Sequence, residues 1–311
     1  MKKSVLQIRP LLPSLETALQ QQYDIHRLWE INDPDSFLQA NGEQFTAVVT
    51  SAPVGVSDDL IRKLPNLKVI SSFGVGYDKI NVPFAKERGI QVGYTPDVLN
   101  DCVADTAMGL VLNVARHFTD ADRYVKDGKW PAGKFPLGTK VSGKRLGILG
   151  LGRIGRAIAK RAEGFDMQIA YHNRNKIPAS PYEYAESLLA LAQWSDFLVI
   201  ASSAGPENQK LVSREIIDAL GPKGYLINIS RGSVVDEDYL IQALKENKIA
   251  GAGLDVFVDE PNVPAELRAL DNVVLFPHIA SATTETRAAM SDLVLENLHS
   301  FFATGTVAVS V

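Results

Sequence analysis

Short apolar runs alternate with amphipathic stretches along most of the chain. The apolar runs have the length of strands buried on both faces, and the stretches between them repeat apolar residues every three or four positions, which is the helical spacing. Such an alternation is typical of a parallel sheet with helices on its faces. In the first third of the chain it predicts strands at 4–8, 47–50, 68–72 and 90–93, with helices at 14–22, 57–63 and 82–88.

A second and more regular alternation begins at Lys144. A helical pattern at 101–116 precedes it, and another at 284–303 follows it. The order of elements between them is that of a doubly wound dinucleotide-binding domain. The predicted strands are 145–149, 167–171, 197–201, 225–229, 252–256 and 273–276, and the helices among them include 154–163, 213–220 and 237–246. We therefore expect an α/β protein of two domains, each built on a doubly wound parallel sheet.

Composition narrows the class of protein without identifying it. With 46% hydrophobic and 22% charged residues, a chain of 311 residues can bury two cores. The formal net charge of −4 gives no basic surface for nucleic acid or for an anionic membrane. No window reaches about 18 consecutive apolar residues, and the first apolar run is too short for a signal peptide, so we expect a cytoplasmic protein.

Metal and disulfide chemistry have few residues available. The lone cysteine, Cys102, excludes an intramolecular disulfide and a cysteine-based metal site. Four histidines show no metal-ligand spacing, and we interpret them as surface or packed residues: His26, His117, His172 and His299. We expect no bound metal.

The first chemical signal is a glycine-rich motif that directly follows the predicted strand 145–149 and opens the next helix. Glycine is needed where the chain turns sharply, where main chain approaches a pyrophosphate, and where a helix packs on a strand. The start of the helix adds free N–H groups and a partial positive charge. The motif, which predicts a dinucleotide site, is Gly150-Leu151-Gly152-Arg153-Ile154-Gly155.

The end of the following strand bears on which dinucleotide binds. NAD enzymes usually have an acidic residue there for the ribose hydroxyls, and its charge would repel the 2′-phosphate of NADP. This chain has Asn173 at that position, followed by Arg174, Asn175 and Lys176. A charge-assisted arginine–phosphate bond is worth roughly 1.5–3 kcal/mol, or about tenfold to a hundredfold in preference. An ordinary solvated basic turn is the alternative, but the location favours NADPH, with NADH as the weaker coenzyme.

Three side chains form a candidate catalytic set: Arg231, Glu260 and His278. Each follows a predicted strand of the second domain, at the end where open α/β sheets bind ligands. Reduction of a ketone needs a proton donor, and histidine is the side chain best suited to that role near neutral pH. A carboxylate would hold the ring and favour its charged form, and an arginine would polarise the keto oxygen. Spacing alone does not establish this set, because one residue of each type per domain is unremarkable.

Five ordered motifs together resemble the D-2-hydroxyacid dehydrogenase family, and the resemblance covers essentially the whole chain. Within the family the similarity is greatest to NADPH-preferring glyoxylate/hydroxypyruvate and hydroxyphenylpyruvate reductases, through residues 69–78 and 95–99. The five motifs lie at 150–155, 228–236, 253–257, 259–261 and 277–281.

The resemblance implies a role for each matching residue. Arg231 would bind the substrate, His278 would be the acid/base, and Glu260 would be its carboxylate partner. The main-chain N–H groups of Val75 and Gly76 would bind the substrate carboxylate. Further cofactor contacts are expected from Ser202, Ile229 and Asp255, of which Asp255 would hold the nicotinamide carboxamide.

The resemblance also implies the domain arrangement. Residues 1–99 and 283–311 would form a flavodoxin-like substrate-binding domain, with a Rossmann cofactor domain, 100–282, inserted into it around one cleft. We expect a homodimer formed through residues 101–130. Trp130, in a loop flanked by glycine and proline, would either reach into the partner's active site or serve as an interface anchor. Residues 203–208 depart from the family pattern through the extra Gly205, which loosens a loop near the adenosine.

These observations predict an NADPH-dependent reductase of a small 2-keto acid, glyoxylate or hydroxypyruvate, that yields the D-2-hydroxy acid. One alternative is a bulkier keto acid such as hydroxyphenylpyruvate or 2-ketogluconate. Formate dehydrogenases of the superfamily carry glutamine where Glu260 stands, so Glu260 disfavours them. A third alternative is a non-enzymatic nucleotide sensor resembling the corepressors of this fold, which the complete Arg231, Glu260 and His278 set disfavours.

Overall fold

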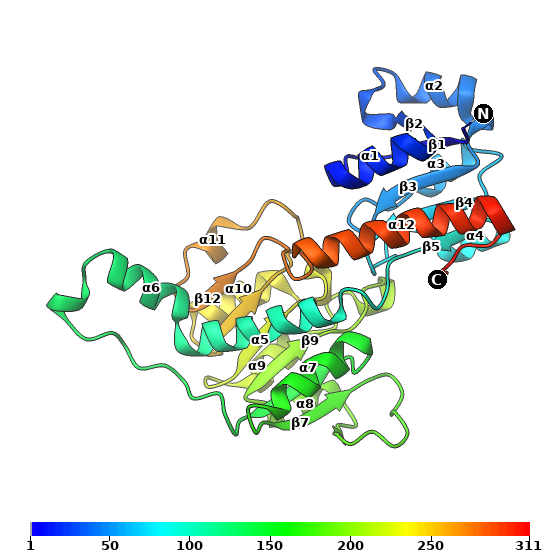
Figure 1. Ribbon diagram of the computed structural model, residues 1–311. Coiled ribbons are helices and arrows are strands. Elements are labelled where there is room, and N and C mark those ends of the chain that lie inside the picture. The colour runs from blue at the N-terminus through cyan, green and yellow to red at the C-terminus, as the bar shows by residue number, and fades with distance from the viewer. Residues whose placement is uncertain (1) are drawn as a thin grey trace. The chain divides into compact units, whose positions relative to one another are not determined.

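Two parallel sheets organise residues 2–311, the part of the chain that this computed structural model describes (Figure 1). The chain forms two compact units, one of Met1–Leu99 with Thr283–Val311 and a second of Asn100–Ala282. Both sheets are parallel and have helices between most successive strands, so the predicted fold class of two doubly wound α/β domains is confirmed.

The first unit has a five-stranded sheet in the order β2-β1-β3-β4-β5, which is the flavodoxin-like order. All four strand pairs are parallel. Its strands are β1 (Ser4–Gln7), β2 (Asp24–Arg27), β3 (Ala47–Ser51), β4 (Val69–Phe73) and β5 (Gln91–Gly93). Its helices are α1 (Pro13–Gln22), α2 (Pro34–Asn41), α3 (Asp58–Arg62), α4 (Val82–Glu87) and α12 (Thr284–Thr304).

Two of these elements were not predicted, β2 and α2. β2 reads Asp-Ile-His-Arg and lies at the sheet edge, where a strand is only partly buried and shows no apolar run. α2 is set by local signals instead of periodicity: Pro34 occupies its first turn, and the Asp33 side chain accepts the N–H of Ser36 at 3.1 Å.

Helix α12 joins the end of the chain to the first unit. Ser71 of β4 donates its hydroxyl to the carbonyl of Val294 at 3.1 Å. The amide of Asn297 is fully buried, donates to the carbonyl of Tyr94 at 3.1 Å and accepts the N–H of Val309 at 2.9 Å. These buried polar bonds explain why residues from both ends of the sequence share one unit.

The second unit has a seven-stranded sheet in the order β12-β11-β10-β9-β6-β7-β8. The strands are β6 (Arg145–Leu149), β7 (Gln168–His172), β8 (Glu183–Tyr184), β9 (Phe197–Ile200), β10 (Tyr225–Asn228), β11 (Gly251–Leu254) and β12 (Val273–Leu275). The helices are α5 (Asn100–Arg116), α6 (Phe118–Lys126), α7 (Arg153–Glu163), α8 (Leu188–Trp194), α9 (Arg214–Leu220), α10 (Glu237–Lys245) and α11 (Ala265–Arg268). Four elements of this unit were not predicted from the sequence: β8, α6, α8 and α11.

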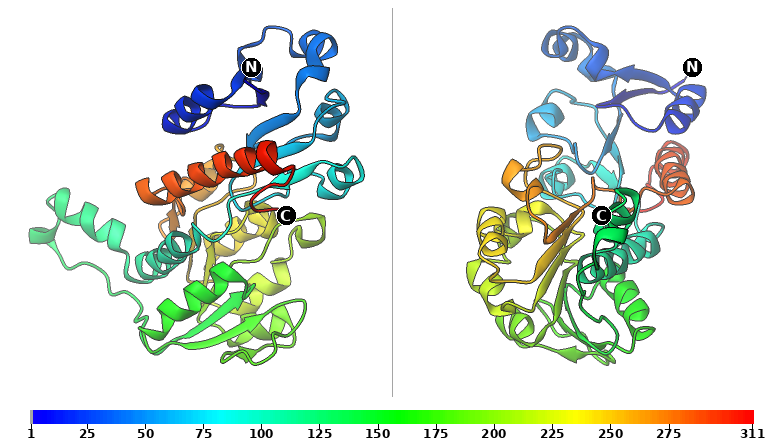
Figure 2. Two further views of the ribbon diagram at one scale, coloured as in Figure 1. Left: turned by 45° about the vertical axis from the view of Figure 1, so that its right-hand side comes forward. Right: turned by 90° about the vertical axis from the view of Figure 1, so that its left-hand side faces the viewer.

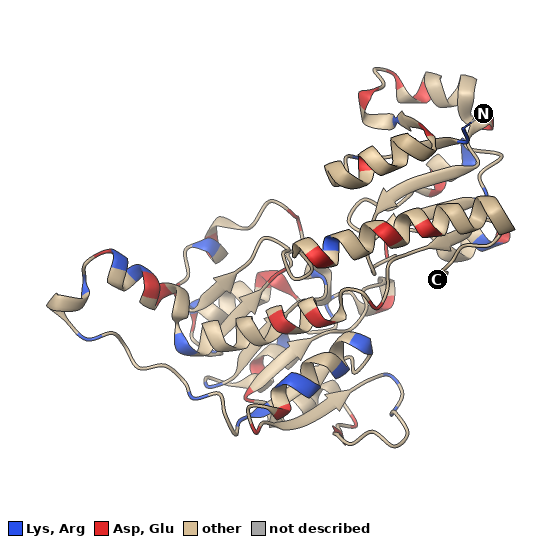
Figure 3. Cartoon of the chain, viewed as in Figure 1, with Lys and Arg blue, Asp and Glu red and all other residues tan. Residues whose placement is uncertain are grey.

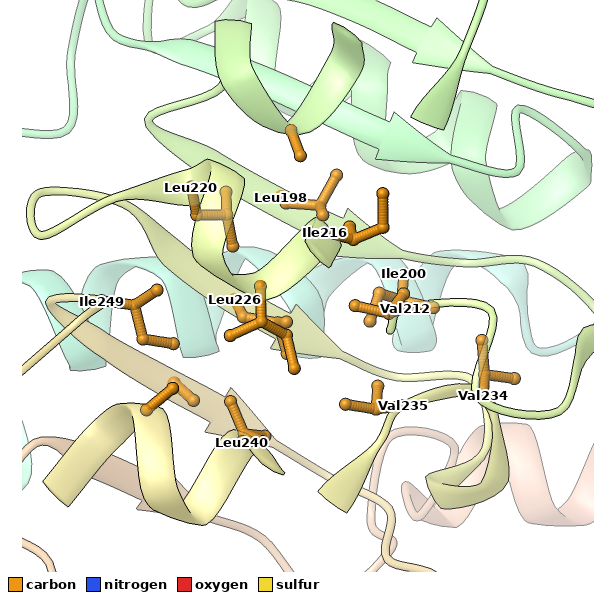
Figure 4. Packing of buried hydrophobic residues seen from close by; sticks show 14 of the residues in the cluster. Leu198, Ile200, Val212, Ile216, Leu220, Leu226, Val234, Val235, Leu240 and Ile249 are labelled. Atoms are coloured by element: carbon orange, nitrogen blue, oxygen red, sulfur yellow. The ribbon is translucent and has the colours of Figure 1, made fainter. Parts of the chain in front are cut away.

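Helices cover both faces of this sheet (Figure 2). α5 and α7 pack on one face, and α8, α9 and α10 enclose a buried cluster on the other. Figure 4 shows part of that cluster, in which Leu198 and Leu226 of the sheet lie among side chains of α9 and α10 such as Ile216 and Leu240. The apolar β9 and β10, buried at every position, are what this two-sided covering requires.

The surface carries charges of both signs. Figure 3 shows acidic and basic positions interspersed over helices and loops of both units. Among residues 2–311, none of the helices has the length and apolar composition that crossing a membrane would take.

Candidate active site

A groove of about 1020 Å³ lies at the carboxyl edge of the seven-stranded sheet, where the winding direction reverses between β6 and β9. Doubly wound sheets bind ligands at this switch point. Six residues expected to contact a cofactor line it: Gly150, Gly152, Asn173, Arg174, Asn175 and Ser202. Three further lining residues belong to the loop 203–208, which the sequence places near the adenosine: Ser203, Glu207 and Asn208. The others were not predicted to line the groove: Leu149, His172, Ala201 and Leu211.

The three glycines of the 150–155 motif serve different purposes. Gly150 has a left-handed backbone with φ 97°, and a Cβ there would lie 2.6 Å from the main-chain nitrogen of Ser202. A Cβ at Gly155 would collide with the carbonyl oxygen of Gly150, so α7 packs directly on the loop. At Gly152, no atom of the described residues lies within 4 Å of such a Cβ, and the main chain is open to the groove. This cradle fits a pyrophosphate.

The hydroxyl of Ser202 supports the same assignment. Its oxygen is buried, and residues 2–311 provide no hydrogen-bond partner for it. Beside it, the hydroxyl of Ser230 donates to the Ser202 carbonyl, and the N–H of Ile229 donates to the carbonyl of Ile200 at 3.4 Å. Because buried hydroxyls are nearly always paired, a polar ligand in the groove would complete this one.

Asn173 has a structural bond that the sequence did not predict. Its Oδ1 accepts the N–H of Leu151 at 2.7 Å, which fixes the glycine-rich loop against the end of β7. His172 is similarly engaged, with Nδ1 2.8 Å from the carbonyl oxygen of Ala185. The amide nitrogen of Asn173 remains to face a ligand.

The two basic residues after Asn173 differ in their surroundings. Arg174 lines the groove, and its Nη2 lies 3.6 Å from Oε1 of Glu207. Lys176 instead places its ammonium 5.7 Å from the centre of the Tyr184 ring. Arg174 is therefore the cation that a ligand in the groove would meet.

The candidate proton donor and its partner are in contact. Nδ1 of His278 lies 2.7 Å from Oε2 of Glu260. The other carboxylate oxygen, Oε1, accepts the N–H of Phe257 at 3.0 Å. The two side chains are 33% and 30% exposed, so the pair is held in place while part of the imidazole reaches solvent.

The charge state of Glu260 decides which group donates the proton in its hydrogen bond with His278. Burial disfavours ionisation of this carboxyl, but the hydrogen bonds from His278 and Phe257 and the positive charges of His278 and Arg231 outweigh it, so its pKa lies below its ordinary value. An ionised carboxylate only accepts, so Nδ1 of His278 donates. The second ring nitrogen, Nε2, then remains to exchange a proton with a substrate.

Arg231 follows β10 in a tightly packed turn. Its Nη1 donates to the carbonyl of Ser230 at 2.8 Å, and the Asn228 side chain donates to the Arg231 carbonyl at 2.9 Å. A Cβ on the next residue, Gly232, would collide with the main chain of Phe257, so this turn lies directly against the segment that leads to Glu260. The structure thus brings Arg231, Glu260 and His278 to one edge of the sheet.

Asp255 is completely buried and holds the loop that carries His278. Its Oδ1 accepts the N–H of Ile279 at 2.7 Å, and its Oδ2 accepts the N–H of Ala280 at 2.9 Å. Burial raises the pKa of this carboxyl, and the two N–H groups oppose that rise. The sequence assigned Asp255 to the nicotinamide and gave no sign of this second task.

The remaining predicted residues belong to other segments of the chain. Val75 and Gly76 follow β4 in the first unit, and their N–H groups enter none of the hydrogen bonds within residues 2–311. Trp130 begins a 3-10 turn, η3 (Trp130–Ala132), and is 67% exposed. Among the residues that the structure describes, no three or more His, Cys, Asp or Glu side chains converge as they would around a metal ion.

Comparison with known proteins places this site in a family. Residues 108–280 match the family described as D-isomer specific 2-hydroxyacid dehydrogenase, NAD binding domain. The chain is 48% identical to a hydroxyphenylpyruvate reductase from Plectranthus scutellarioides over 96% of both chains. It is 42% identical to a 2-ketogluconate reductase from Gluconobacter oxydans, over 100% of this chain and 99% of that protein.

A solved structure agrees with these matches. It is an NADPH-dependent glyoxylate/hydroxypyruvate reductase from Sinorhizobium meliloti, in complex with NADP and malonate. The TM-score is 0.94 at 40% identity, covering 100% of this chain and 97% of the other. The chain belongs to the D-isomer-specific 2-hydroxyacid dehydrogenase family. The resemblance deduced from its motifs is confirmed, and this dehydrogenase is an NAD(P)-dependent oxidoreductase.

The pKa of Glu260 in the dehydrogenase leads to a prediction about stability. Because this pKa is lower in the folded chain than in the unfolded one, ionisation of Glu260 stabilises the fold above the unfolded value of about 4.3, and the contribution is lost as the pH falls through the folded pKa. As the pH is lowered from about 5 to about 3, the free energy of unfolding of Glu260→Gln should therefore fall less than that of the wild type.

Urea unfolding midpoints measured across this pH range test the prediction. Glu266→Gln, which removes an exposed carboxylate of α11, is the control and should follow the wild type. If the urea midpoints of the wild type and of Glu260→Gln fall in parallel with pH, the contact with His278 does not lower the pKa of Glu260 on folding.

Proposed function

We propose that this dehydrogenase reduces a small 2-keto acid, glyoxylate or hydroxypyruvate, to the D-2-hydroxy acid with NADPH. The observation that carries the proposal is the His278–Glu260 contact beside Arg231, at the sheet edge that also holds the glycine-rich groove. A proton donor, a fixed carboxylate partner and a cation are what carbonyl reduction requires. In this proposal Asn100–Ala282 is the dinucleotide-binding domain, and the other unit is the substrate-binding domain.

Each site residue has its own role in the proposed reaction. NADPH, when bound, supplies the hydride. His278 gives the proton on Nε2 to the keto oxygen, while Glu260 holds Nδ1–H and balances the charge of the imidazolium. Arg231 polarises the keto oxygen and pairs with the substrate carboxylate. In this proposal the N–H groups of Val75 and Gly76 donate hydrogen bonds to the same carboxylate.

The groove residues are assigned to the coenzyme. The main chain at Gly152 and the start of α7, with Arg153 and Ile154, receive the pyrophosphate. Ser202 and Ile229 lie at the ends of β9 and β10, where Ser202 offers its unpaired hydroxyl. Arg174 binds the 2′-phosphate, and Asn173 with Asn175 contacts the ribose.

A bulkier substrate is the second candidate. The relatives named hydroxyphenylpyruvate reductase and 2-ketogluconate reductase match the chain over nearly its full length. Both substrates are 2-keto acids, so the proton relay is the same for each. Comparison of kcat/KM over a panel of keto acids, followed through loss of NADPH absorbance, decides between them.

We also propose that the chain is a cytoplasmic homodimer that pairs through its arm, defined as residues 117–139. The arm stands away from the sheet of its own unit and contains α6 and η3 (Figure 1). It is tied to α5 at both ends, since Thr119 N–H donates to Asn113 and Thr139 N–H donates to Ala115. Four large apolar side chains of the arm are exposed: Phe118, Val125, Trp130 and Leu137. A second copy would cover them, with Trp130 as anchor or as a contact to the partner's site.

The dimer prediction is tested by the mass in solution. The wild type should sediment as a dimer at assay concentration, and Leu137→Glu should shift it toward monomer, because Leu137 is 97% exposed in one copy and its face would be buried in the pair. Val54→Glu changes an exposed apolar residue outside the arm and serves as control. A monomeric wild type would remove the role given to Trp130.

The proton relay predicts a large loss in turnover. His278→Asn should lower kcat by roughly 10²–10⁴-fold, the usual worth of a general acid, while NADPH binding stays nearly unchanged because His278 is not part of the groove. Initial rates with glyoxylate and a fluorescence titration of NADPH measure the two effects. His299→Asn, on the exposed side of α12, is the control. Retention of more than about a tenth of the turnover would reject His278 as the acid.

Coenzyme preference is predicted to follow Arg174. NADPH should be preferred over NADH by at least about tenfold in kcat/KM, from the strength of an arginine–phosphate bond, and Arg174→Asp should reverse the ratio. Arg268→Asp changes an exposed arginine of α11 by the same charge and should leave the ratio alone. Equal use of both coenzymes by the unmodified protein would contradict the assignment.

A further inference from the structure

An acidic residue faces the cation that the coenzyme groove offers. Glu207 lies in the 3-10 turn η4 (Pro206–Asn208), and its Oε1 is 3.6 Å from Nη2 of Arg174. Both residues line the groove at the end of β7 and in the loop after β9. A negative charge thus stands where the 2′-phosphate of NADPH would approach Arg174.

The position of Glu207 depends on Gly205. The backbone of Gly205 is extended, so any residue could adopt its conformation and the glycine is not needed for the turn. Its missing side chain leaves space, however. A Cβ at this position would lie 2.6 Å from Oε2 and 3.0 Å from Oε1 of Glu207. The carboxylate therefore occupies the volume that a side chain at position 205 would fill.

The turn itself is well fixed. Asn208 donates its N–H to the Gly205 carbonyl at 3.0 Å and its side-chain amide to the Ser203 carbonyl at 2.7 Å. Pro206 restricts the backbone between them. Glu207 can consequently move its carboxylate only by rotating its own side chain.

We propose that Glu207 is a coenzyme-discriminating residue that competes with the 2′-phosphate for Arg174 and thereby limits the preference for NADPH. The inference rests on the proposed use of NADPH. A phosphate monoester carries about −1.5 to −2 charges at neutral pH, so it is repelled by the carboxylate and must displace it from the guanidinium. NADH carries a neutral hydroxyl at that position, from which a carboxylate can accept a hydrogen bond.

The exposure of the pair limits the size of the effect. The side chains of Arg174 and Glu207 are 76% and 56% exposed, and an ion pair in such surroundings changes an equilibrium by no more than about fivefold. Repulsion of a doubly charged phosphate adds to this at low ionic strength. We expect Glu207→Gln to lower the Kd of NADPH by about threefold to tenfold and to change the Kd of NADH by less than about twofold.

Two variants separate charge from position. Glu207→Gln removes the charge, whereas Gly205→Ala keeps it and obliges the carboxylate to leave the space beside residue 205. Both should tighten NADPH binding, and Gly205→Ala should do so to a smaller extent. Glu215→Gln in α9 removes one exposed carboxylate that does not line the groove, and it is the matched control for overall charge.

The experiment is a fluorescence titration of the full-length protein with NADPH and with NADH, at about 0.02 M and about 0.3 M salt. Selective tightening of NADPH by Glu207→Gln that shrinks at high salt supports the proposal. Equal shifts for Glu207→Gln and Glu215→Gln, or unchanged or weaker NADPH binding by Glu207→Gln, overturn it. If Gly205→Ala leaves the Kd of NADPH unchanged, the role of Gly205 in making space for the Glu207 carboxylate is rejected.

Failure of the proposed function gives a different result. If Arg174→Asp leaves NADPH binding unchanged, the 2′-phosphate does not bind at Arg174, and the coenzyme assignment itself is wrong. If Arg174→Asp weakens NADPH binding while Glu207→Gln has no effect, the assignment stands and only the competition by Glu207 is rejected.

Discussion

A single buried carboxylate, Asp255, holds together the sheet edge that carries the proposed catalytic residues. Its own N–H bonds the carbonyl of Asn228 at 3.0 Å, which joins the ends of β10 and β11. Its side chain bonds the N–H groups of Ile279 and Ala280, which joins β11 to the segment after β12. Burial of a charge costs free energy unless donors compensate it, and here two main-chain donors offset part of that cost. Arg231, Glu260 and His278 each follow one of the three strands that Asp255 links.

The coenzyme groove depends on exposed charges instead of buried hydrogen bonds. Its floor is main chain, because Gly150 and Gly152 bring the backbone to the surface, and its specificity rests on a few exposed side chains. Exposed charges act weakly and respond to salt, so under the proposed assignment small changes around Arg174 would shift the choice of coenzyme without disturbing the His278–Glu260 pair. The proposed selectivity and the proposed chemistry would then be separable, because their residues follow different strands of one sheet.

The sequence predicted the features that arise from local pattern. Buried strands such as 197–201 and 225–229 are apolar because both sheet faces are covered, and the glycine motif is specified by backbone geometry. The edge strand β2 lacked such a pattern and was not predicted. Helix α8 was also not predicted, although Leu188, Leu191 and Ala192 have helical spacing, because it is only seven residues long. Contacts across the sheet were beyond pattern analysis: Asn173 with Leu151, and Arg174 with Glu207, depend on which strand ends become neighbours in the folded sheet.

The backbone of His278 shows why Asp255 is needed. His278 has φ 53°, a left-handed conformation that is unfavourable for residues other than glycine and persists only where surrounding structure enforces it. Two bonds from Asp255 to the next two residues supply that enforcement, while Glu260 fixes the ring from the other side. The main chain and the imidazole are thus restrained independently. For the proposed proton donor, these two restraints supply on a loop the precision that strands and helices would otherwise provide, and they leave Nε2 outside the contact with Glu260.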